Sequence, residues 1–162
     1  MTTVVVRSAA VGDVPVLLAL IRALAEFEKL SHQVVATEAT LKASMFGSRQ
    51  YAEALIAEVD GAPVGFALFF HSFSTFLGEP GLYLEDLFVR PEARSHGIGL
   101  QLMSELARVA LGRGCRRFEW SVLDWNERAL SFYRRLGAEP MAEWTVQRLT
   151  GAALERLASA NG

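Results

Sequence analysis

The spacing of apolar side chains along the chain predicts alternating helices and strands. Apolar residues recur every third or fourth position over 14–29 and over 98–113, so each segment has one face suited to packing on a core. Asp13 is expected to cap the first of these helices. The helices expected are 14–29, 37–47, 98–113, 127–136 and 152–158.

Strands are indicated by short runs of β-branched and aromatic residues between turn signals. Asp60-Gly61 predicts a tight hairpin turn between two of them, and a loop is expected over 72–81. The strand that contains Glu85-Asp86 departs from simple alternation at that pair. The strands expected are 4–6, 54–59, 64–71, 82–89, 117–122 and 144–149.

This order of elements predicts an α/β domain with a mixed sheet and helices on both faces. The chain has 162 residues, of which 51% are hydrophobic and 21% charged, so residues 1–162 are expected to form a single globular domain. The formal charge of −2 offers no bulk attraction to nucleic acid or to an anionic membrane. The longest apolar stretch, 64–70, is too short to cross a bilayer.

Cysteine and histidine usage narrows the chemistry. A single cysteine, Cys115, excludes an internal disulfide and suits a reducing compartment. Because the N-terminus also lacks a signal-peptide pattern, a cytoplasmic location is expected. His32, His71 and His96 have no metal-ligand spacing, so no metal is expected.

The most informative stretch is Pro91-Glu-Ala-Arg-Ser-His-Gly-Ile-Gly99, between an expected strand and an expected helix. A helix N-terminus favours an anion, and glycines let the backbone approach a phosphate closely. Arg94 would add a charged donor. A Rossmann fingerprint would need a third glycine and a Walker A loop a lysine; neither is present. An ordinary strand-to-helix turn, with glycines for tight packing, explains the same pattern about equally well.

A second group of residues follows at 124–133. Asn126 and Tyr133 lie two helical turns apart and share a face of the expected helix. The Tyr133 hydroxyl could protonate a thiolate leaving group. Equally, Asn126 could be a helix cap and Tyr133 a core aromatic beside Phe132.

Together these residues resemble a known family. Arg94-Ser-His-Gly-Ile-Gly99 matches the Arg/Gln-x-x-Gly-x-Gly/Ala signature of GNAT acetyltransferases. Tyr83-Leu-Glu-Asp-Leu-Phe-Val89 and Val122-Leu-Asp-Trp-Asn126 resemble the branch that contains spermidine/spermine and thialysine N-acetyltransferases. The resemblance extends over nearly the whole chain. It implies a mostly antiparallel mixed sheet, splayed open where acetyl-CoA binds.

The resemblance also implies roles for individual residues. Tyr133 falls on the family's general acid, and a homodimer is expected. The acetyl-CoA site would comprise Leu87, Phe88, Val89, Arg94, Ser95, His96, Gly97, Ile98, Gly99, Asn126, Arg128 and Ala129. The amine site would comprise Phe27, Glu28, Glu85, Glu119, Trp120 and Ser121.

A protonated amine must lose a proton before it attacks a thioester, and a nearby carboxylate can accept that proton. Glu85 is the candidate, because a carboxylate within an apolar strand is unusual. For Glu28, a role in amine binding and a role as an ordinary surface charge are about equally favoured. For Asp86 a structural role is favoured, since adjacent strand residues face opposite ways.

The expected activity is therefore acetyl transfer from acetyl-CoA to a small-molecule amine, such as a polyamine or a lysine-like side chain. The chain departs from the family at two positions. Ser95 replaces a glycine in the loop that begins at Arg94, and Phe76 replaces a tryptophan near the expected amine pocket. A protein or peptide amine acceptor, or a non-catalytic acyl-CoA-binding module, remains an alternative.

Overall fold

The computed structural model describes residues 1–160 and divides into two compact units, Met1–Ser121 and a second that begins at Val122. Each unit is described separately. The elements of the described chain are β1 (Val4–Ser8), η1 (Val11–Asp13), α1 (Val14–Phe27), η2 (Ser31–Gln33), α2 (Glu38–Phe46), β2 (Glu53–Val59), β3 (Ala62–Ser74), β4 (Glu79–Val89), η3 (Pro91–His96), α3 (Ile98–Gly112), β5 (Phe118–Trp120), α4 (Glu127–Arg135) and α5 (Gly151–Ala158).

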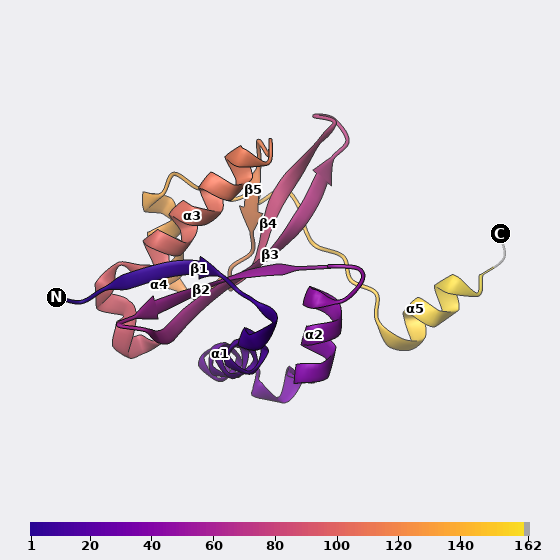
Figure 1. The fold of residues 1–162 in the computed structure, drawn as a ribbon. Helices are drawn as coiled ribbons and strands as arrows, with labels where there is room; N and C mark the ends of the chain where they lie inside the picture. Colours follow the sequence, from indigo (N-terminus) through magenta and orange to yellow (C-terminus); the bar gives the residue numbers. More distant parts are fainter. Residues whose placement is uncertain (161–162) are drawn as a thin grey trace. The chain divides into compact units, whose positions relative to one another are not determined.

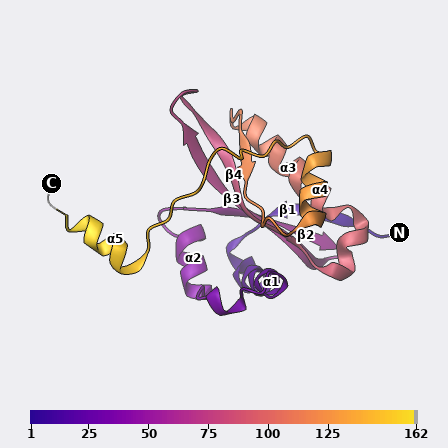
Figure 2. The same ribbon diagram turned by 180° about the vertical axis from the view of Figure 1, so that it is seen from behind.

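Within the described residues, the first unit is built on a five-stranded sheet in the order β1-β2-β3-β4-β5. The first four strands are antiparallel to their neighbours, whereas β5 runs parallel to β4. In both views α1 and α2 lie on one side of the sheet and α3 on the other (Figure 1, Figure 2). The expected mixed sheet with helices on both faces is confirmed.

The apolar stripe of α1 forms the core on one face. Leu17 and Leu20 pack with Met45 of α2 and with Ile56 and Phe66 of the sheet, and all five side chains are buried. Burial of this apolar surface is the main stabilising contribution to this layer. The expected helix 14–29 thus folds because its stripe has a sheet face to cover.

The α3 stripe covers the opposite face. Ile98, Leu102 and Leu106 are fully buried, at the four-residue spacing that the sequence shows. Helix α3 contacts β1, β2, β3 and β4. A long buried helix therefore starts directly after η3, and this fixes the position of its N-terminus against β4.

Two hairpins join the antiparallel strands. Asp60 and Gly61 turn with φ of 50° and 82°, as the sequence predicts for this pair. The expected loop over 72–81 is largely wrong. Both ends of that segment belong to strands, since Ser72 pairs with Gly81 and Ser74 with Glu79, and only 75–78 form the turn.

The N-terminal ends of α1 and α2 differ in how they are capped. Thr37 caps α2, and its hydroxyl accepts a hydrogen bond from the Thr40 amide at 3.2 Å. Asp13 precedes α1, but its carboxylate makes no capping bond to that helix. It is used instead by the Arg7 guanidinium, at 2.8 Å, and by the Ala10 amide, at 2.7 Å. Asp13 thus occupies the expected N-cap position, but its side chain does not form the expected capping bond.

The second unit contains α4 and α5, both close to their expected positions. The expected strand 144–149 is not formed, and this segment is irregular. Trp144 is 78% exposed and Val146 79% exposed. Alternating apolar residues form a strand only when a neighbouring strand satisfies the backbone hydrogen bonds, and no such strand pairs with this segment within residues 1–160.

Candidate active site

The sheet is open between β4 and β5. The two strands pair from Leu82–Phe118 to Leu84–Trp120 and no further. Within residues 1–160, the remainder of β4, 85–89, has no strand on this side. The expected strand 117–122 is correspondingly shorter, because its last residues have no β4 partner. The splayed sheet expected at the cofactor site is present.

The backbone of β4 presents alternate residues to this opening. Arg90 donates a hydrogen bond from its amide to the carbonyl oxygen of Val64 at 2.8 Å, so Arg90 faces β3. In an antiparallel ladder alternate residues face the partner, which turns the backbone of Phe88 toward β3 and that of Leu87 and Val89 away from it. Of the three residues, Leu87 and Val89 offer backbone groups at the open edge.

The turn from β4 to α3 is more regular than a loop. Pro91–His96 form a 3₁₀ helix, and Gly97 follows with φ of 67°. Gly97 occupies the N-cap position of α3 and supplies no side-chain cap. The first-turn amides of α3, at 98–100, therefore lack an intrahelical acceptor, and they lie at the positive end of the helix dipole. This geometry fits a pyrophosphate.

Arg94 is held against the end of β4. Its Nε donates a hydrogen bond to the carbonyl oxygen of Val89 at 3.0 Å. Its guanidinium carbon lies 4.9 Å from the ring centroid of Phe27 and 6.0 Å from that of Phe88. These contacts link the end of α1, the open edge of β4 and η3 through a single side chain.

Ser95 and His96 are exposed on η3. The His96 Nδ1 lies 3.2 Å from the carbonyl oxygen of Ala93 and 3.4 Å from the Ser95 hydroxyl. Ala93 itself is buried and anchors the 3₁₀ turn to the core. The cofactor roles expected for Ser95 and His96 stay predictions.

A β-bulge lies at the acidic pair of β4. Asp86 pairs with Leu68 of β3, but the next β3 residue, Phe69, pairs with Leu84, so Glu85 is an extra residue without a cross-strand partner. The irregular pattern at Glu85-Asp86 in the sequence is this bulge. Because the bulge breaks the alternation of side chains, the alternation argument for a structural role of Asp86 does not apply, and that role stays a prediction.

Three carboxylates are close enough to influence one another here. The pKa of Asp86 is raised to about 6, first by burial and then by the negative charges of Glu85 and Glu28. Burial also raises the pKa of Glu28, at the end of α1. Glu85 is exposed and Asp86 is half-buried. The structure thus brings together the three acidic residues that the sequence singles out.

The expected amine-site segment of β5 lies beside the start of β4. The Tyr83 and Ser121 hydroxyls share a hydrogen bond of 2.8 Å. The Trp120 ring stands edge-to-face against Phe118, with centroids 4.9 Å apart, and Glu119 is exposed. Sequence reasoning did not single out Tyr83. Tyr83 is the first residue of the Tyr83–Val89 motif, and this position could have pointed to it.

In the second unit, Asn126 is a helix cap. Its side-chain oxygen accepts a hydrogen bond from the Ala129 amide at 3.2 Å. This agrees with the interpretation of Asn126 as a helix cap. Tyr133 is half-buried on α4, and its ring centroid lies 5.5 Å from that of Phe132. Arg128 is exposed in the first turn of the same helix. The roles expected for Tyr133 and Arg128 stay predictions.

Comparison with known proteins assigns the family. The sequence model of the acetyltransferase (GNAT) family matches residues 20–138. The chain is 42% identical to a thialysine N-epsilon-acetyltransferase of Bos taurus over 98% of this chain and 99% of that protein. This chain belongs to the GNAT acetyltransferase family.

Two further similar proteins extend the comparison. The chain is 32% identical to an L-ornithine N5-acetyltransferase of Arabidopsis thaliana, over 96% of this chain and 88% of that protein. A solved structure of an integron cassette protein from Vibrio cholerae superposes with a TM-score of 0.78 at 27% identity, over 97% of this chain and 98% of that one. The chain is accordingly an acyltransferase, of a family that takes its acetyl group from acetyl-CoA.

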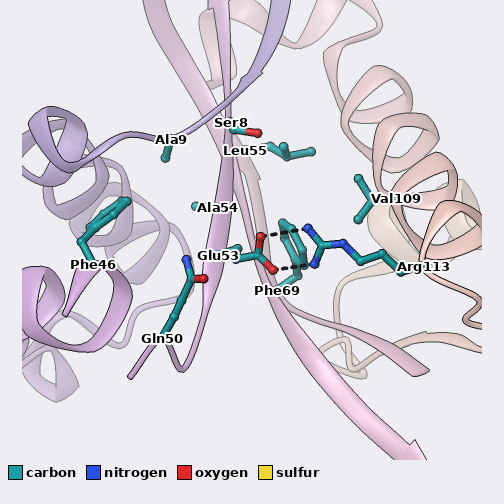
Figure 3. A pocket seen from close by; sticks show the side chains of 10 residues that line it. All are labelled: Ser8, Ala9, Phe46, Gln50, Glu53, Ala54, Leu55, Phe69, Val109 and Arg113. Carbon is teal, nitrogen blue, oxygen red and sulfur yellow. Dashed lines mark hydrogen bonds and ion pairs between the residues drawn. The ribbon is translucent and has the colours of Figure 1, made fainter. Parts of the chain in front are cut away.

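The structure also has a pocket that sequence reasoning did not find, lined by residues from or next to β1, α2, β2, β3 and α3 (Figure 3). Its wall includes a bidentate ion pair in which Arg113, the C-cap residue of α3, donates to Glu53 of β2 at 2.6 and 2.9 Å. The Arg113 guanidinium lies 5.7 Å from the Phe69 ring centroid. The two charges neutralise each other, and the ion pair joins the end of α3 to the sheet. The pocket is lined by Ser8, Ala9, Phe46, Gln50, Glu53, Ala54, Leu55, Phe69, Val109 and Arg113.

Among residues 1–160, no group of three or more His, Cys, Asp and Glu side chains is arranged to hold a metal ion. No helix in the same range combines the length and the apolar character needed to span a bilayer.

Proposed function

We propose that this GNAT enzyme transfers the acetyl group of acetyl-CoA to the primary amine of a small molecule, of the polyamine or lysine-like class. The observation that carries the proposal is the acidic group Glu28, Glu85 and Asp86 beside the open edge of β4. An alkyl ammonium ion is attracted to such a group. The thialysine and ornithine acceptors named for two relatives belong to the same chemical class and support the assignment.

Acetyl-CoA is proposed to bind along the opening of the sheet. Backbone groups of Leu87 and Val89 would bind the acetyl and pantetheine portions, with Phe88 holding the strand in the core. The amides that follow Gly97 would bind the pyrophosphate, because an unpaired helix N-terminus favours anions. The remaining proposed contacts are Arg94, Ser95, His96, Ile98, Gly99, Asn126, Arg128 and Ala129.

The amine is proposed to bind among side chains of α1, β4 and β5. Glu28 and Glu85 supply negative charge, and the exposed ring of Phe27 supplies an apolar wall for an alkyl chain. The remaining proposed contacts, all in or just after β5, are Glu119, Trp120 and Ser121. A short polar segment at the edge of the sheet suits a flexible, extended amine.

The reaction is proposed to proceed by direct attack. The ammonium ion first loses a proton to a carboxylate, and the amine nitrogen then forms a bond to the thioester carbon. The tetrahedral species loses the second nitrogen proton as its carbon–sulfur bond breaks. Tyr133 donates its phenolic proton to the departing thiolate and is reprotonated from solvent. The products are the N-acetyl amine, CoA thiol and one proton.

We further propose that residues 1–162 act as a single GNAT domain, as a homodimer in the cytoplasm. The family match over 20–138 spans the boundary between the two units, which supports a single functional domain. Large exposed apolar side chains, including Phe73, Phe76 and Trp144, support self-association. The lone Cys115, buried and reduced, suits the compartment.

The test is release of free thiol from acetyl-CoA in the presence of a panel of amines. The panel contains thialysine, lysine, ornithine, spermidine, putrescine and a lysine-containing peptide. Selective turnover of a small amine supports the proposal. Turnover of the peptide alone would replace it with a protein acceptor. Tight binding of acetyl-CoA with no turnover of any amine would indicate a non-catalytic acyl-CoA-binding module.

A further inference from the structure

Tyr83 of β4 projects on the side of the sheet that carries α1. Its neighbour Leu84 pairs with Phe69, and the Phe69 ring centroid lies 5.7 Å from the guanidinium carbon of Arg113, at the end of α3. Directly opposed residues of an antiparallel pair project to the same side, so Leu84 faces α3. Adjacent strand residues face opposite ways, and Tyr83 therefore faces α1, together with its cross-strand partner Phe70.

The β-bulge brings the acidic group onto the same face. Asp86 pairs with Leu68, which packs against the core on the α1 side. Strict alternation from Tyr83 would place Asp86 on the α3 side, but the extra residue Glu85 absorbs one step of it. Asp86 therefore faces α1, as Tyr83 does, and Glu28 follows directly at the C-terminal end of α1. Tyr83 thus lies on the face where the acceptor amine is proposed to bind.

The Tyr83 hydroxyl holds the chain just beyond the last pair of the β4–β5 ladder. That ladder is parallel and its register ends at Leu84–Trp120, so Ser121 is the first residue after β5 that pairs with no residue of β4. The Tyr83 and Ser121 hydroxyls share a hydrogen bond of 2.8 Å. Tyr83 is opposite Glu119 in the register, and Ser121, two residues further along, projects on the same face. The phenol thus spans the step from the paired to the open part of the sheet.

The ring of Tyr83 is itself held in place. Its centroid lies 5.2 Å from that of Phe70 on β3, at an interplanar angle of 34°. Tyrosine has few rotatable bonds, so a ring fixed against one neighbour directs its hydroxyl to a defined point. Strand β5, by contrast, is three residues long and stands at the end of the strand order. The end of such a short edge strand opens easily, and the hydrogen bond from Tyr83 opposes this opening at Ser121.

We propose that Tyr83 is a positioning residue for the acceptor amine and acts through Ser121. The inference rests on the proposed function and deepens it, because Ser121 belongs to the proposed amine site. Either hydroxyl can donate to the other, and in both arrangements each oxygen keeps a lone pair that can accept from an ammonium group. A Ser121 hydroxyl at a fixed position suits acceptors of one length and geometry, whereas a mobile one discriminates less between acceptors. Tyr83 therefore contributes to the choice of acceptor and takes no part in proton transfer.

The test compares the wild type with Tyr83→Phe, Ser121→Ala and the double variant, using the two best amines of the panel. Tyr83→Phe keeps the ring that contacts Phe70 and removes only the hydroxyl. It should raise KM for the best amine about threefold to tenfold and change kcat less than about twofold, as expected for one lost hydrogen bond between neutral groups. The preference for the best amine over the second, measured as a ratio of kcat/KM values, should fall. KM for acetyl-CoA should be unchanged.

The double variant separates a positioning role from two independent contacts. If Tyr83 acts through Ser121, the double variant should be no worse than Ser121→Ala, because the effects of two residues in one hydrogen bond are not additive. Effects that multiply would overturn the inference, and so would a Tyr83→Phe enzyme with the wild-type KM and preference. Ser121→Thr keeps the hydroxyl and should retain the wild-type KM. Tyr51→Phe, at an exposed tyrosine before β2, is the matched control and should change neither KM nor preference.

Hydrogen exchange in the free enzyme gives a readout that does not require turnover. Tyr83→Phe should speed exchange of the backbone amides at 119–121 and leave those of β2 and β3 unchanged, because the lost hydrogen bond acts on the end of β5. Equal protection of these amides in the variant and the wild type would overturn the inference. If no amine of the panel is acetylated although this exchange becomes faster, it is the proposed function that fails.

Discussion

Arg94 donates a hydrogen bond from Nε to the carbonyl oxygen of Val89 at 3.0 Å, and so binds the loop before α3 to the open edge of β4. The family signature begins at this arginine. Its side chain is oriented by the strand whose backbone is proposed to bind acetyl-CoA. The loop and the strand edge are thereby held in a fixed relation by a single side chain.

Replacing Arg94 should therefore weaken cofactor binding. Arg94→Ala removes a charged donor and the link to Val89, and should raise KM for acetyl-CoA about tenfold or more. Arg94→Lys keeps the charge but lacks the planar guanidinium that lies over Phe27, so it should recover only part of the loss. Steady-state kinetics at saturating amine measure both. An unchanged KM for acetyl-CoA in Arg94→Ala would contradict the assignment.

Gly97 starts α3 with a left-handed backbone. A methyl group added at this position meets no atom within 4 Å, so the cost of Gly97→Ala is conformational: about 1 kcal/mol of the free energy of unfolding. The change should also weaken acetyl-CoA binding. Gly112→Ala is the matched control, since its added methyl group also meets nothing and its φ lies outside the left-handed region.

Urea denaturation measures the free energy of unfolding of the two glycine variants and of the wild type. Gly97→Ala should be less stable than the wild type, whereas Gly112→Ala should equal or exceed it, because alanine is the better residue at the end of a helix. Equal stability of all three proteins would contradict the prediction, because it would show that alanine at position 97 carries no conformational cost.

Asp86 should make the folded state less stable as the pH rises. Its pKa is about 6 in the folded protein against 3.8 for an unperturbed aspartate, so the folded state binds the proton more tightly. The free energy of unfolding therefore falls between these two values and is lowest above the higher one. The full shift corresponds to about 2 to 3 kcal/mol.

Asp86→Asn removes this penalty, so it should be more stable than the wild type by about 2 kcal/mol at pH 8, with the difference vanishing near pH 3.5. Asp124→Asn, at an exposed aspartate, is the control and should show no such difference. Thermal and urea unfolding across this pH range measure it. A stability difference that grows toward low pH would have the wrong sign for a buried carboxyl.

Tyr133→Phe tests the general acid. Loss of the hydroxyl should lower kcat about a hundredfold and leave the affinity for acetyl-CoA unchanged, because the ring is retained. Phe132→Leu, on the same helix, controls for packing and should affect stability more than kcat. A Tyr133→Phe enzyme with the wild-type kcat would show that the thiolate departs without this proton.

The sequence predicts those parts of the fold that depend on local pattern. The stripes of α1 and α3 and the Asp60-Gly61 turn are read from spacing and turn chemistry alone. The segment 144–149 has the composition of a strand but forms none, because a strand depends on a partner that its own residues do not specify.

In the candidate site, too, the sequence predicts which residues take part but not the contacts that depend on the folded chain. The motif locates Arg94 and the acidic pair, but the bond from Arg94 to Val89 depends on how the 3₁₀ turn folds back. The face on which Asp86 lies depends on a cross-strand register that only the paired structure fixes. The sequence shows an irregularity at Glu85, and it does not show that the bulge reverses the side chain that follows.

The central claim, acetyl transfer to a small amine, is tested most directly by competition. The enzyme is given acetyl-CoA with equal concentrations of thialysine, spermidine and a lysine-containing peptide, and the acetylated products are identified by mass spectrometry at early times. The proposed function predicts that an acetylated small amine forms first and in stoichiometric yield with CoA thiol. Acetylation of the peptide in preference to both small amines would contradict it.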